Sequence, residues 1–423
     1  MTRKLPRREF LKTTGAGVIA LPLLGANAYA GGSATLRVGL VGCGGRGTGA
    51  AIQAINADPG VVLWSMGDLF ADRLKSSHVG LTENFKDRID VPNVRQHVGF
   101  EAYKRVIEEV DVVLFATPPV FRPMHLAAAV EAGRHVFCEK PVAVDAPGVR
   151  SVLKTAKLAA EKGISLASGF CWRAAFGHRS LYNRVLKENA IGDVRHVYAT
   201  YLAGGVWYKE RQEKWTDLEY QLRNWYYYSN FSGDHIVEQA IHSVDKLLWA
   251  KGDEIPVSAL AMGGRQVRTA EKYGNIYDHF GVVYEWADGT QGHLVTRQQN
   301  GCHSENLDRI VGSDGIASID GWANRFVVEG ARPWKYEGPN NDMYQTEHDE
   351  LFASIRSGAP INQGVSMAQS TMAAILGRMS AYTGQRITWQ QAMESKQDLT
   401  PKSWEFGSGI DVVQATPGKT KFI

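Results

Sequence analysis

One stretch near the start of the chain constrains its fold more than any other. An apolar run over residues 36–41 continues into Gly42-x-Gly44-x-x-Gly47, and a helix-permissive segment follows over residues 48–56. A strand, a glycine turn and a helix in this order are typical of a unit that binds a dinucleotide. Gly42 permits the tight turn, Gly44 lets the backbone approach a pyrophosphate, and Gly47 lets the helix pack closely on the strand. The alternative is a glycine turn without a ligand.

A carboxylate follows the next apolar run at the distance expected for a nucleotide ribose. The run over residues 61–66 ends at Gly67-Asp68, about twenty residues beyond the glycine turn, where a carboxylate binds the adenosine ribose hydroxyls. Asp68 therefore favours NAD over NADP, because its charge repels a 2′-phosphate; Arg73 is the nearest arginine that could turn to one. Gly45 and Arg46 lie within the turn and are predicted to contact the same cofactor.

The first thirty residues indicate export. Arg7-Arg8 precede an apolar segment over residues 15–24, and Ala28-Tyr29-Ala30 forms a cleavage site. This predicts a twin-arginine signal peptide over residues 1–30 and a periplasmic protein. The apolar segment is too short to span a membrane. No cysteine follows the cleavage site, so no membrane anchor is expected after signal removal. The alternative is an amphipathic terminal helix.

The charge balance gives no support for a nucleic-acid partner. The chain has 47 Lys and Arg against 44 Asp and Glu. Residues 1–30 contain five of the basic residues and one of the acidic ones, which leaves 42 and 43 in the mature chain. The basic surplus therefore belongs to the signal, and neither nucleic acid nor an anionic membrane surface is expected to bind.

Strand-like and helical segments alternate up to residue 168. Strand-like runs cover residues 110–116, 135–138 and 164–168, and helical patterns cover residues 125–132 and 146–161. This alternation predicts a parallel doubly wound sheet, a Rossmann domain over residues 35–168. Ligands of such a sheet lie at the carboxyl ends of its strands.

The pattern changes after Gly169. Six alternating runs follow, with hairpin signals at Asp288-Gly289 and Asp314-Gly315. They predict an α+β domain over residues 169–385, built on a mostly antiparallel open sheet and closed by helices over residues 345–356 and 366–383. Residues 386–423 are predicted to be an irregular tail. We expect a homo-oligomer that forms through the second sheet.

These motifs, together with Glu139-Lys140-Pro141 and a later helix that carries histidine, resemble the Gfo/Idh/MocA oxidoreductases. That family includes glucose–fructose oxidoreductase and inositol dehydrogenase. The resemblance runs from about residue 36 to residue 383, and the Glu-Lys-Pro triplet is its most specific mark. It implies that Lys140 lies beside the nicotinamide and the substrate hydroxyl, and that the Lys140–Pro141 bond is cis. It also implies cofactor contacts from Thr117, Pro118, His125, Glu139, Lys140 and Arg173.

Physical chemistry supports the role of the lysine independently. A lysine at a strand end is well placed to stabilise charge as an alcohol becomes an alkoxide and then a ketone. The alternative is an ordinary solvated pair of Glu139 and Lys140 before a turn.

The segment from residue 234 to residue 248 has two faces if it is helical. His235, Glu238, His242 and Asp245 share one of them, at three- and four-residue spacing. In the family, a histidine at the position of His242 is the general acid or base, a role that its near-neutral pKa suits. Glu238 takes a position that usually holds aspartate, so substrate geometry should differ. The alternatives are a zinc or manganese site on this stripe and a solvated polar face; we expect no metal.

Aromatic side chains suited to the faces of sugar rings are dense before this segment. The predicted substrate-binding residues are Trp172, Trp225, Tyr226, Glu238, His242 and Asp245.

An exported dehydrogenase has no pool of free NAD, so it must carry its cofactor and restore it in every cycle. The sequence therefore predicts an oxidoreductase with tightly bound NAD(P), acting on a hydroxyl of a carbohydrate through Lys140, His242 and Glu238. One alternative is an NAD-dependent glycosidase that oxidises, eliminates and re-reduces. Another is a non-catalytic sugar-binding protein or a metalloprotein.

Overall fold

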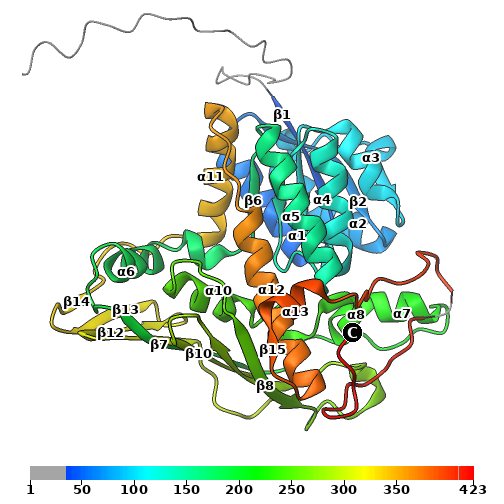
Figure 1. Ribbon diagram of the computed structural model, residues 1–423. Helices are drawn as coiled ribbons and strands as arrows, with labels where there is room; N and C mark the ends of the chain where they lie inside the picture. The colour runs from blue at the N-terminus through cyan, green and yellow to red at the C-terminus, as the bar shows by residue number, and fades with distance from the viewer. Residues whose placement is uncertain (1–34, 408) are drawn as a thin grey trace, which may run out of the picture.

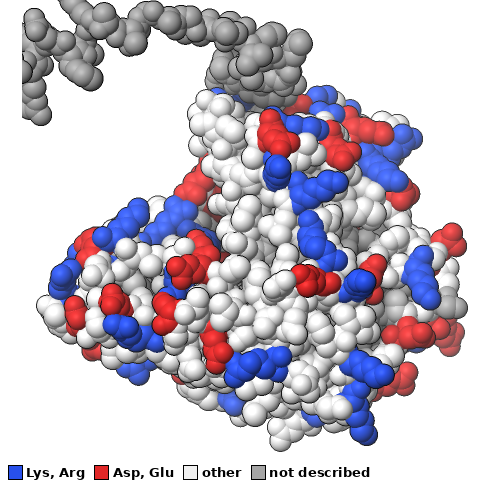
Figure 2. Space-filling view, in the orientation of Figure 1, with Lys and Arg blue, Asp and Glu red and all other residues white. Residues whose placement is uncertain are grey.

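The computed structural model describes residues 35–407 and 409–423, so the predicted signal over residues 1–30 lies outside the described residues. Figure 1 shows an α/β unit stacked on a broad second sheet, with the C-terminal tail beside both. None of the helices in the described part is long and apolar enough to cross a membrane. On the face shown in Figure 2, basic and acidic side chains are interspersed.

The first sheet confirms the predicted Rossmann architecture. Its six parallel strands lie in the order β3-β2-β1-β4-β5-β6. They are β1 (Leu36–Val41), β2 (Val61–Asp68), β3 (Gln96–Val98), β4 (Val112–Phe115), β5 (His135–Cys138) and β6 (Leu166–Ser168). From β1 the sheet is extended in one direction by β2 and β3, and in the other direction by β4, β5 and β6. Such sheets bind ligands in the crevice between β1 and β4, where the direction changes.

Five helices connect these strands. They are α1 (Gly45–Ala57), α2 (Ala71–Phe85), α3 (Ala102–Glu109), α4 (Arg122–Glu131) and α5 (Ala146–Glu161). Small side chains bring α1 close to the sheet, because Ala50, Ala51 and Ala54 are its buried face. The Asp145 carboxylate caps α5 by accepting a hydrogen bond from the Gly148 N–H at 2.8 Å.

One helix lies in a different domain from the one predicted. Helix α11 (Met343–Ser357) packs on α1 instead of closing the second domain. Its apolar residues Leu351, Phe352 and Ile355 belong to the same buried cluster as the strands β1 and β2. The Arg356 guanidinium also binds the Asp58 carboxylate, with Nε 2.7 Å from Oδ2. The apolar face of α11 therefore completes the nucleotide domain, although more than 200 residues separate it from β5.

The second sheet is mostly antiparallel, as predicted. Its nine strands lie in the order β14-β13-β12-β11-β7-β10-β9-β8-β15, and the β7–β10 pair is parallel. They are β7 (Val194–Ala203), β8 (Ser258–Gly264), β9 (His279–Glu285), β10 (Gln291–Gln298), β11 (Leu307–Gly312), β12 (Gly315–Asp320), β13 (Arg325–Gly330), β14 (Trp334–Lys335) and β15 (Ile387–Thr388). The strands β13 to β15 were not predicted; β14 and β15 have only two residues each, too few to show an alternating pattern.

Helices cover one face of this sheet. They are α6 (Phe176–Leu186), α10 (Ile241–Ala250) and α12 (Gly364–Thr383). The short helices α7 (Asp217–Arg223), α8 (Ser229–Ser232) and α9 (His235–Glu238) lie in the long connection between β7 and β8. Leu260, Met262 and Val295 are exposed on these strands, where they alternate with buried residues.

The tail is less irregular than predicted. It begins with β15 and the helix α13 (Trp389–Glu394), which a Thr388/Gln391 capping box starts. From residue 395 it is irregular but bound to both domains. The Leu399 N–H donates to the Asp145 carboxylate at 2.8 Å, and Gln221 exchanges two hydrogen bonds with the backbone of Ile410 at 2.7 and 3.0 Å.

The glycine turn gives a direct test of this packing. A Cβ at Gly47 would lie 1.9 Å from the Gly42 carbonyl oxygen, whereas a Cβ at Gly45 would have nothing within 4 Å. We expect Gly47→Ala to lower the free energy of unfolding by about 3 kcal/mol, the upper part of the usual range for overpacking. The matched control Gly45→Ala should leave it unchanged within about 1 kcal/mol. Urea unfolding of both variants would show this, and equal stabilities would contradict it.

Candidate active site

A cavity at the carboxyl ends of β1, β2 and β4 brings together half of the predicted cofactor residues. It is lined by Gly42, Gly44, Asp68, Thr117, Pro118 and His125. A second cavity adjoins it and shares Ala116 and Trp225. Arg46, Glu139 and Lys140 line the second one. Nine of the twelve predicted nucleotide residues thus follow one continuous groove, and Gly45, Gly47 and Arg173 line neither cavity.

Asp68 is held rigidly at the edge of the first cavity. Its Oδ2 accepts the Cys43 N–H at 2.6 Å and its Oδ1 accepts the Phe70 N–H at 2.8 Å. Burial raises the pKa of the Asp68 carboxyl, and the two N–H donors oppose this rise. Arg73 lines the same cavity, and its Nε is buried without a hydrogen-bond partner. This position lets the Asp68 carboxylate accept hydrogen bonds from the hydroxyls of a ribose bound in the cavity. The Arg73 side chain lines the same cavity.

His125 is part of the cavity wall. Its ring stacks on Tyr103 with centroids 4.2 Å apart and on Phe121 at 5.7 Å. Burial, and then the nearby Arg122, lower the pKa of His125 to about 3. The imidazole is therefore neutral, and it packs beside Thr117, whose hydroxyl lies 3.3 Å from Nδ1.

The glycine turn has room for a pyrophosphate. A Cβ at Gly42 would lie 2.7 Å from the backbone of Ala116, so no other residue fits this turn, where φ is +96°. Gly45 opens on free space at the N-terminus of α1, where backbone N–H groups favour an anion. The Arg46 Nε is buried without a hydrogen-bond partner, although it lies 2.9 Å from the Glu139 carboxylate. These residues fit a dinucleotide.

The C-terminal tail packs on the wall of the first cavity. Its Trp404 ring lies 4.5 Å from Phe121 and 5.7 Å from Phe100, and Phe406 lies 5.1 Å from Phe100, measured between centroids. Phe100 and Phe121 line the cavity, so the tail supports the wall from the outside.

The second cavity has a volume of about 600 Å³ and contains the predicted catalytic residues. Lys140, Glu238 and His242 line it together with Trp172, Trp225 and Tyr226. The Lys140 Nζ donates to the Glu238 carbonyl oxygen at 2.6 Å and lies 3.7 Å from its carboxylate. The Lys140–Pro141 bond is cis, as the resemblance implied.

His242 is a buried, neutral imidazole in this cavity. Its Nδ1 has no hydrogen-bond partner. Burial, and then Lys140 and Lys246, hold the pKa of His242 well below its ordinary value. The ring can therefore accept a proton at neutral pH.

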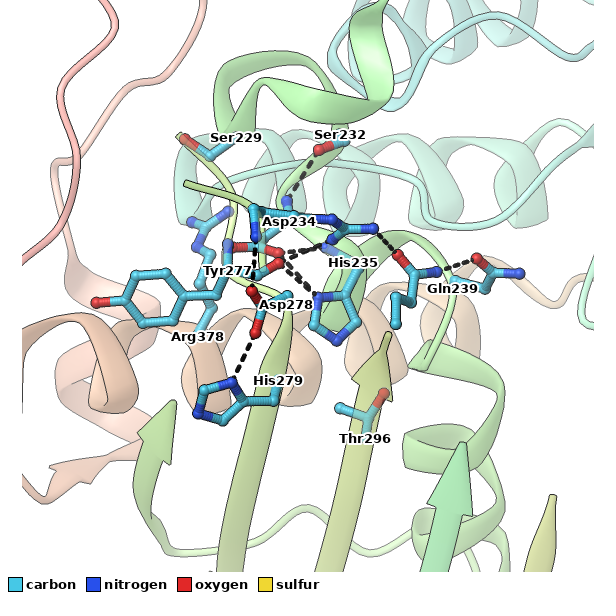
Figure 3. Close-up of polar contacts among 12 residues, drawn as sticks. Ser229, Ser232, Asp234, His235, Gln239, Tyr277, Asp278, His279, Thr296 and Arg378 are labelled. Atoms are coloured by element: carbon cyan, nitrogen blue, oxygen red, sulfur yellow. Dashed lines mark hydrogen bonds and ion pairs between the residues drawn. The ribbon is translucent and has the colours of Figure 1, made fainter. Parts of the chain in front are cut away.

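The four-residue polar stripe predicted on one helix does not exist. The helix breaks after α9, and α10 begins at Ile241, so the two short helices point their side chains differently. Figure 3 shows His235 directed toward Asp234 and Tyr277, and its Nδ1 lies 3.1 Å from the Tyr277 carbonyl oxygen. Only Glu238 and His242 of the stripe line the cavity. In the described part of the chain, no group of three or more His, Cys, Asp or Glu is arranged to hold a metal ion.

Arg173 and Asp245 bind each other instead of lining either cavity. The Arg173 Nε lies 2.8 Å from one Asp245 oxygen and 3.0 Å from the other, and Arg173 also binds Asp253. Asp245 accepts a further hydrogen bond from the Ser370 hydroxyl at 2.7 Å. The sequence predicted a cofactor contact for Arg173 and a substrate contact for Asp245, but the structure pairs the two residues with each other. Their pairing connects α10 to the segment after β6.

Two family models match the chain. The one described as "Oxidoreductase family, NAD-binding Rossmann fold" matches residues 36–170, and the one described as "GFO/IDH/MocA C-terminal domain" matches residues 182–318. The chain belongs to the Gfo/Idh/MocA oxidoreductase family.

Individual members of the family resemble this chain at modest identity. Inositol 2-dehydrogenase of Rhizobium meliloti (strain 1021) is 25% identical over 273 residues, which cover 62% of this chain and 73% of that protein. A glycosyl hydrolase family 109 protein of Solibacter usitatus is 22% identical over 330 residues, or 74% of this chain and 72% of that protein. Other relatives match over about half of their own length.

A solved structure shows the same fold. The aldose-aldose oxidoreductase from Caulobacter crescentus, complexed with glycerol, superposes with a TM-score of 0.67 at 19% identity, over 84% of this chain and 99% of that one.

Several residues that line the second cavity of this Gfo/Idh/MocA protein were not among the predicted site residues. They are Arg122, Tyr201, Val206, Trp207, Gln239, Trp322, Met343 and Tyr344. Trp207 belongs to the aromatic-rich stretch, which was a usable signal. Trp322 and Tyr344 come from β12–β13 and α11, and their sequence contexts give no sign that the fold brings them here.

The buried His242 makes stability depend on pH in a defined direction. Its folded-state pKa is lowered, while the unfolded chain has a pKa of about 6.5. Its contribution to stability is therefore complete above about pH 6.5 and decreases as pH falls below that value. When the pH falls from 7 to 5, the free energy of unfolding of the wild type should decrease. The decrease should be about 1–2 kcal/mol smaller for His242→Gln, which lacks the imidazole. Urea unfolding at both pH values measures this, and parallel curves would count against a neutral His242.

Proposed function

We propose that this chain is an exported, periplasmic oxidoreductase that keeps NAD bound and oxidises a hydroxyl of a carbohydrate by hydride transfer. The observation that carries the proposal is the meeting of Lys140, Glu238 and His242 in a cavity that adjoins the glycine turn. Membership of the family and its resemblance to an inositol 2-dehydrogenase support it.

The residues divide the chemistry among them. NAD, when bound along the groove, supplies the hydride acceptor. Lys140 presents an ammonium N–H where the substrate oxygen gains negative charge, and its bond to the Glu238 carbonyl fixes its position. His242 is neutral and takes the hydroxyl proton. The Glu238 carboxylate balances the lysine charge and offers an acceptor to a neighbouring hydroxyl.

Retention of the cofactor is part of the proposal. An exported enzyme without a supply of NAD must keep the molecule it carries. The packing of Trp404 and Phe406 against the wall of the first cavity supports slow exchange. The buried Asp68 supports NAD over NADP, because a 2′-phosphate would lie against its charge.

Assembly into a homo-oligomer through the second sheet stays a prediction. The apolar side chains exposed on that sheet support it; the most exposed of them, Met262, has 76% of its surface accessible.

An NAD-dependent glycosidase is the second candidate. The similarity to a glycosyl hydrolase family 109 protein favours it, and that match covers 74% of this chain. A neutral imidazole beside a lysine also suits proton abstraction next to a transient ketone. The two candidates differ in outcome: the glycosidase releases an aglycone without net change in bound NAD, whereas the oxidoreductase passes electrons to a second molecule.

Replacement of the lysine tests the catalytic assignment. Lys140→Met should reduce turnover at least about 100-fold, because it removes the charge that stabilises the developing oxyanion. Bound dinucleotide should remain, since Lys140 lies outside the first cavity. Lys157→Met is the matched control, because this lysine side chain is 81% exposed on α5. Wild-type turnover in Lys140→Met, or loss of turnover in the control, would contradict the assignment.

The identity and retention of the cofactor give another test. Mass spectrometry of the denatured wild type should find NAD in stoichiometric amount. A double variant with Trp404→Ala and Phe406→Ala should lose it during gel filtration, whereas Val413→Ala, at a 74% exposed position of the same tail, should not. Release of NADP alone would refute the choice of NAD, and full retention by the double variant would refute the role of the tail.

A further inference from the structure

The second cavity contains three basic side chains, and each already has partners. The Lys140 ammonium binds Glu238. Arg46 binds the Gln53 side chain and lies 2.9 Å from the Glu139 carboxylate. Arg122 donates to two carbonyl oxygens, those of Thr117 at 2.8 Å and Pro141 at 2.5 Å.

The acidic side chains of this cavity, Glu139 and Glu238, are the partners of the same cations. Two of the three lining cations are therefore paired with carboxylates, and the third, the buried Arg122, donates to backbone carbonyl oxygens. A carboxylate or phosphate on the substrate would have to displace one of these carboxylate or carbonyl partners, which costs free energy because the displaced group is left buried without its hydrogen bond.

A second group of polar side chains that line the cavity is uncharged, and we call it the neutral wall. Gln239 Oε1 accepts the Tyr226 hydroxyl at 2.9 Å, and Gln239 Nε2 donates to the Tyr201 hydroxyl at 3.0 Å. All three side chains line the cavity. Burial raises the pKa of Tyr226 well above its ordinary value, so its hydroxyl stays neutral.

A buried network holds this wall from behind. The Gln298 Nε2 donates to Gln239 Oε1 at 2.5 Å and to the Tyr226 hydroxyl at 2.7 Å. Arg268 binds the other end of Gln298 and donates to the Tyr277 carbonyl oxygen at 2.8 Å. Figure 3 labels Gln239 and Tyr277, the two ends of this network. The neutral Gln298 side chain thus lies between the Arg268 guanidinium and Gln239, and these hydrogen bonds fix the orientation of both amides.

Two indole rings are accessible in the same cavity. Trp207 is 43% exposed and Trp322 is 47% exposed, and both line it. Trp207 lies 6.2 Å from Trp225 and Trp322 lies 6.1 Å from Tyr201, measured between centroids. Exposed flat rings beside fixed neutral donors and acceptors match a ligand with apolar C–H faces and hydroxyl edges.

We propose that the substrate is an uncharged glycoside, selected by the neutral wall of Tyr201, Tyr226 and Gln239 and by the indoles of Trp207 and Trp322. A sugar acid, sugar phosphate or nucleotide-linked sugar finds no free cation among these lining residues. Gln239 is the specificity-determining residue, and Gln298 is a positioning residue that acts through it. This inference rests on the proposed function, because it concerns the substrate of the same site.

The test uses binding, so that its failure is separate from a failure of hydride transfer. Holoprotein carrying His242→Gln, which keeps every charged side chain of the cavity, is titrated with 4-nitrophenyl glycosides of glucose, galactose, mannose, N-acetylglucosamine and N-acetylgalactosamine. The matched anionic ligands are 4-nitrophenyl glucuronide, glucose 6-phosphate and UDP-glucose. Isothermal titration should find saturable binding of at least one neutral glycoside, and at least about ten-fold weaker binding of every anionic ligand, which corresponds to about 1.4 kcal/mol.

Variants then connect the preference to the named residues. Trp322→Ala, Trp207→Ala and Gln239→Glu should each weaken binding of the neutral ligand about ten-fold. Gln298→Leu should weaken it less than Gln239→Glu does. The control Phe422→Ala, at an exposed aromatic residue in the tail, should leave it unchanged. Tighter binding of an anionic ligand, no binding of any neutral one, or wild-type affinity in all three cavity variants would overturn the proposal. Absence of bound dinucleotide from the wild type would instead refute the proposed function.

Discussion

The chemistry of this site depends on one hydrogen bond across the domain boundary. Lys140 follows the end of β5 by two residues in the nucleotide domain, and its Nζ donates to the Glu238 carbonyl oxygen at 2.6 Å, at the end of α9 in the second domain. The acceptor is a backbone atom, so the position of the ammonium depends on where the helix breaks. That break also sets the start of α10, which carries His242. The break between α9 and α10 therefore positions both Lys140, which stabilises the developing negative charge, and His242, which takes the proton.

Buried polar groups fix the break itself. Asp234 precedes α9 with a φ of +77°, a conformation that costs free energy for any residue with a side chain. Its carboxylate accepts the His235 N–H at 2.5 Å, the Tyr277 N–H at 2.8 Å and the Tyr382 hydroxyl at 2.5 Å. Donors from three separate parts of the chain converge on one carboxylate, and together they compensate for the unfavourable backbone. Figure 3 shows Asp234 with two of them, His235 and Tyr277.

The sequence was most informative where a pattern is local. The glycine turn, the strand alternation and the Glu-Lys-Pro triplet each predicted a feature from adjacent residues, and the six-stranded parallel sheet confirms the fold. The stripe from His235 to Asp245 failed for the opposite reason. Helical spacing assumes a continuous helix, but Asp234 finds partners at Tyr277 and Tyr382 that only the tertiary structure supplies. Trp322 and the helix α11 reach their places through similar long-range packing, which periodicity does not encode.

The tail has a consequence for the order of events during maturation. The glycine turn, Asp68 and the strands that form the first cavity all precede residue 169, while Trp404 is synthesised more than 200 residues later. Domains form from the N-terminus onward during synthesis. The nucleotide domain, apart from α11, can thus be complete while the cavity wall still lacks its outer support. If the protein is exported as we propose, loading of the dinucleotide in the cytoplasm before this closure would let the folded molecule leave that compartment with its ligand enclosed.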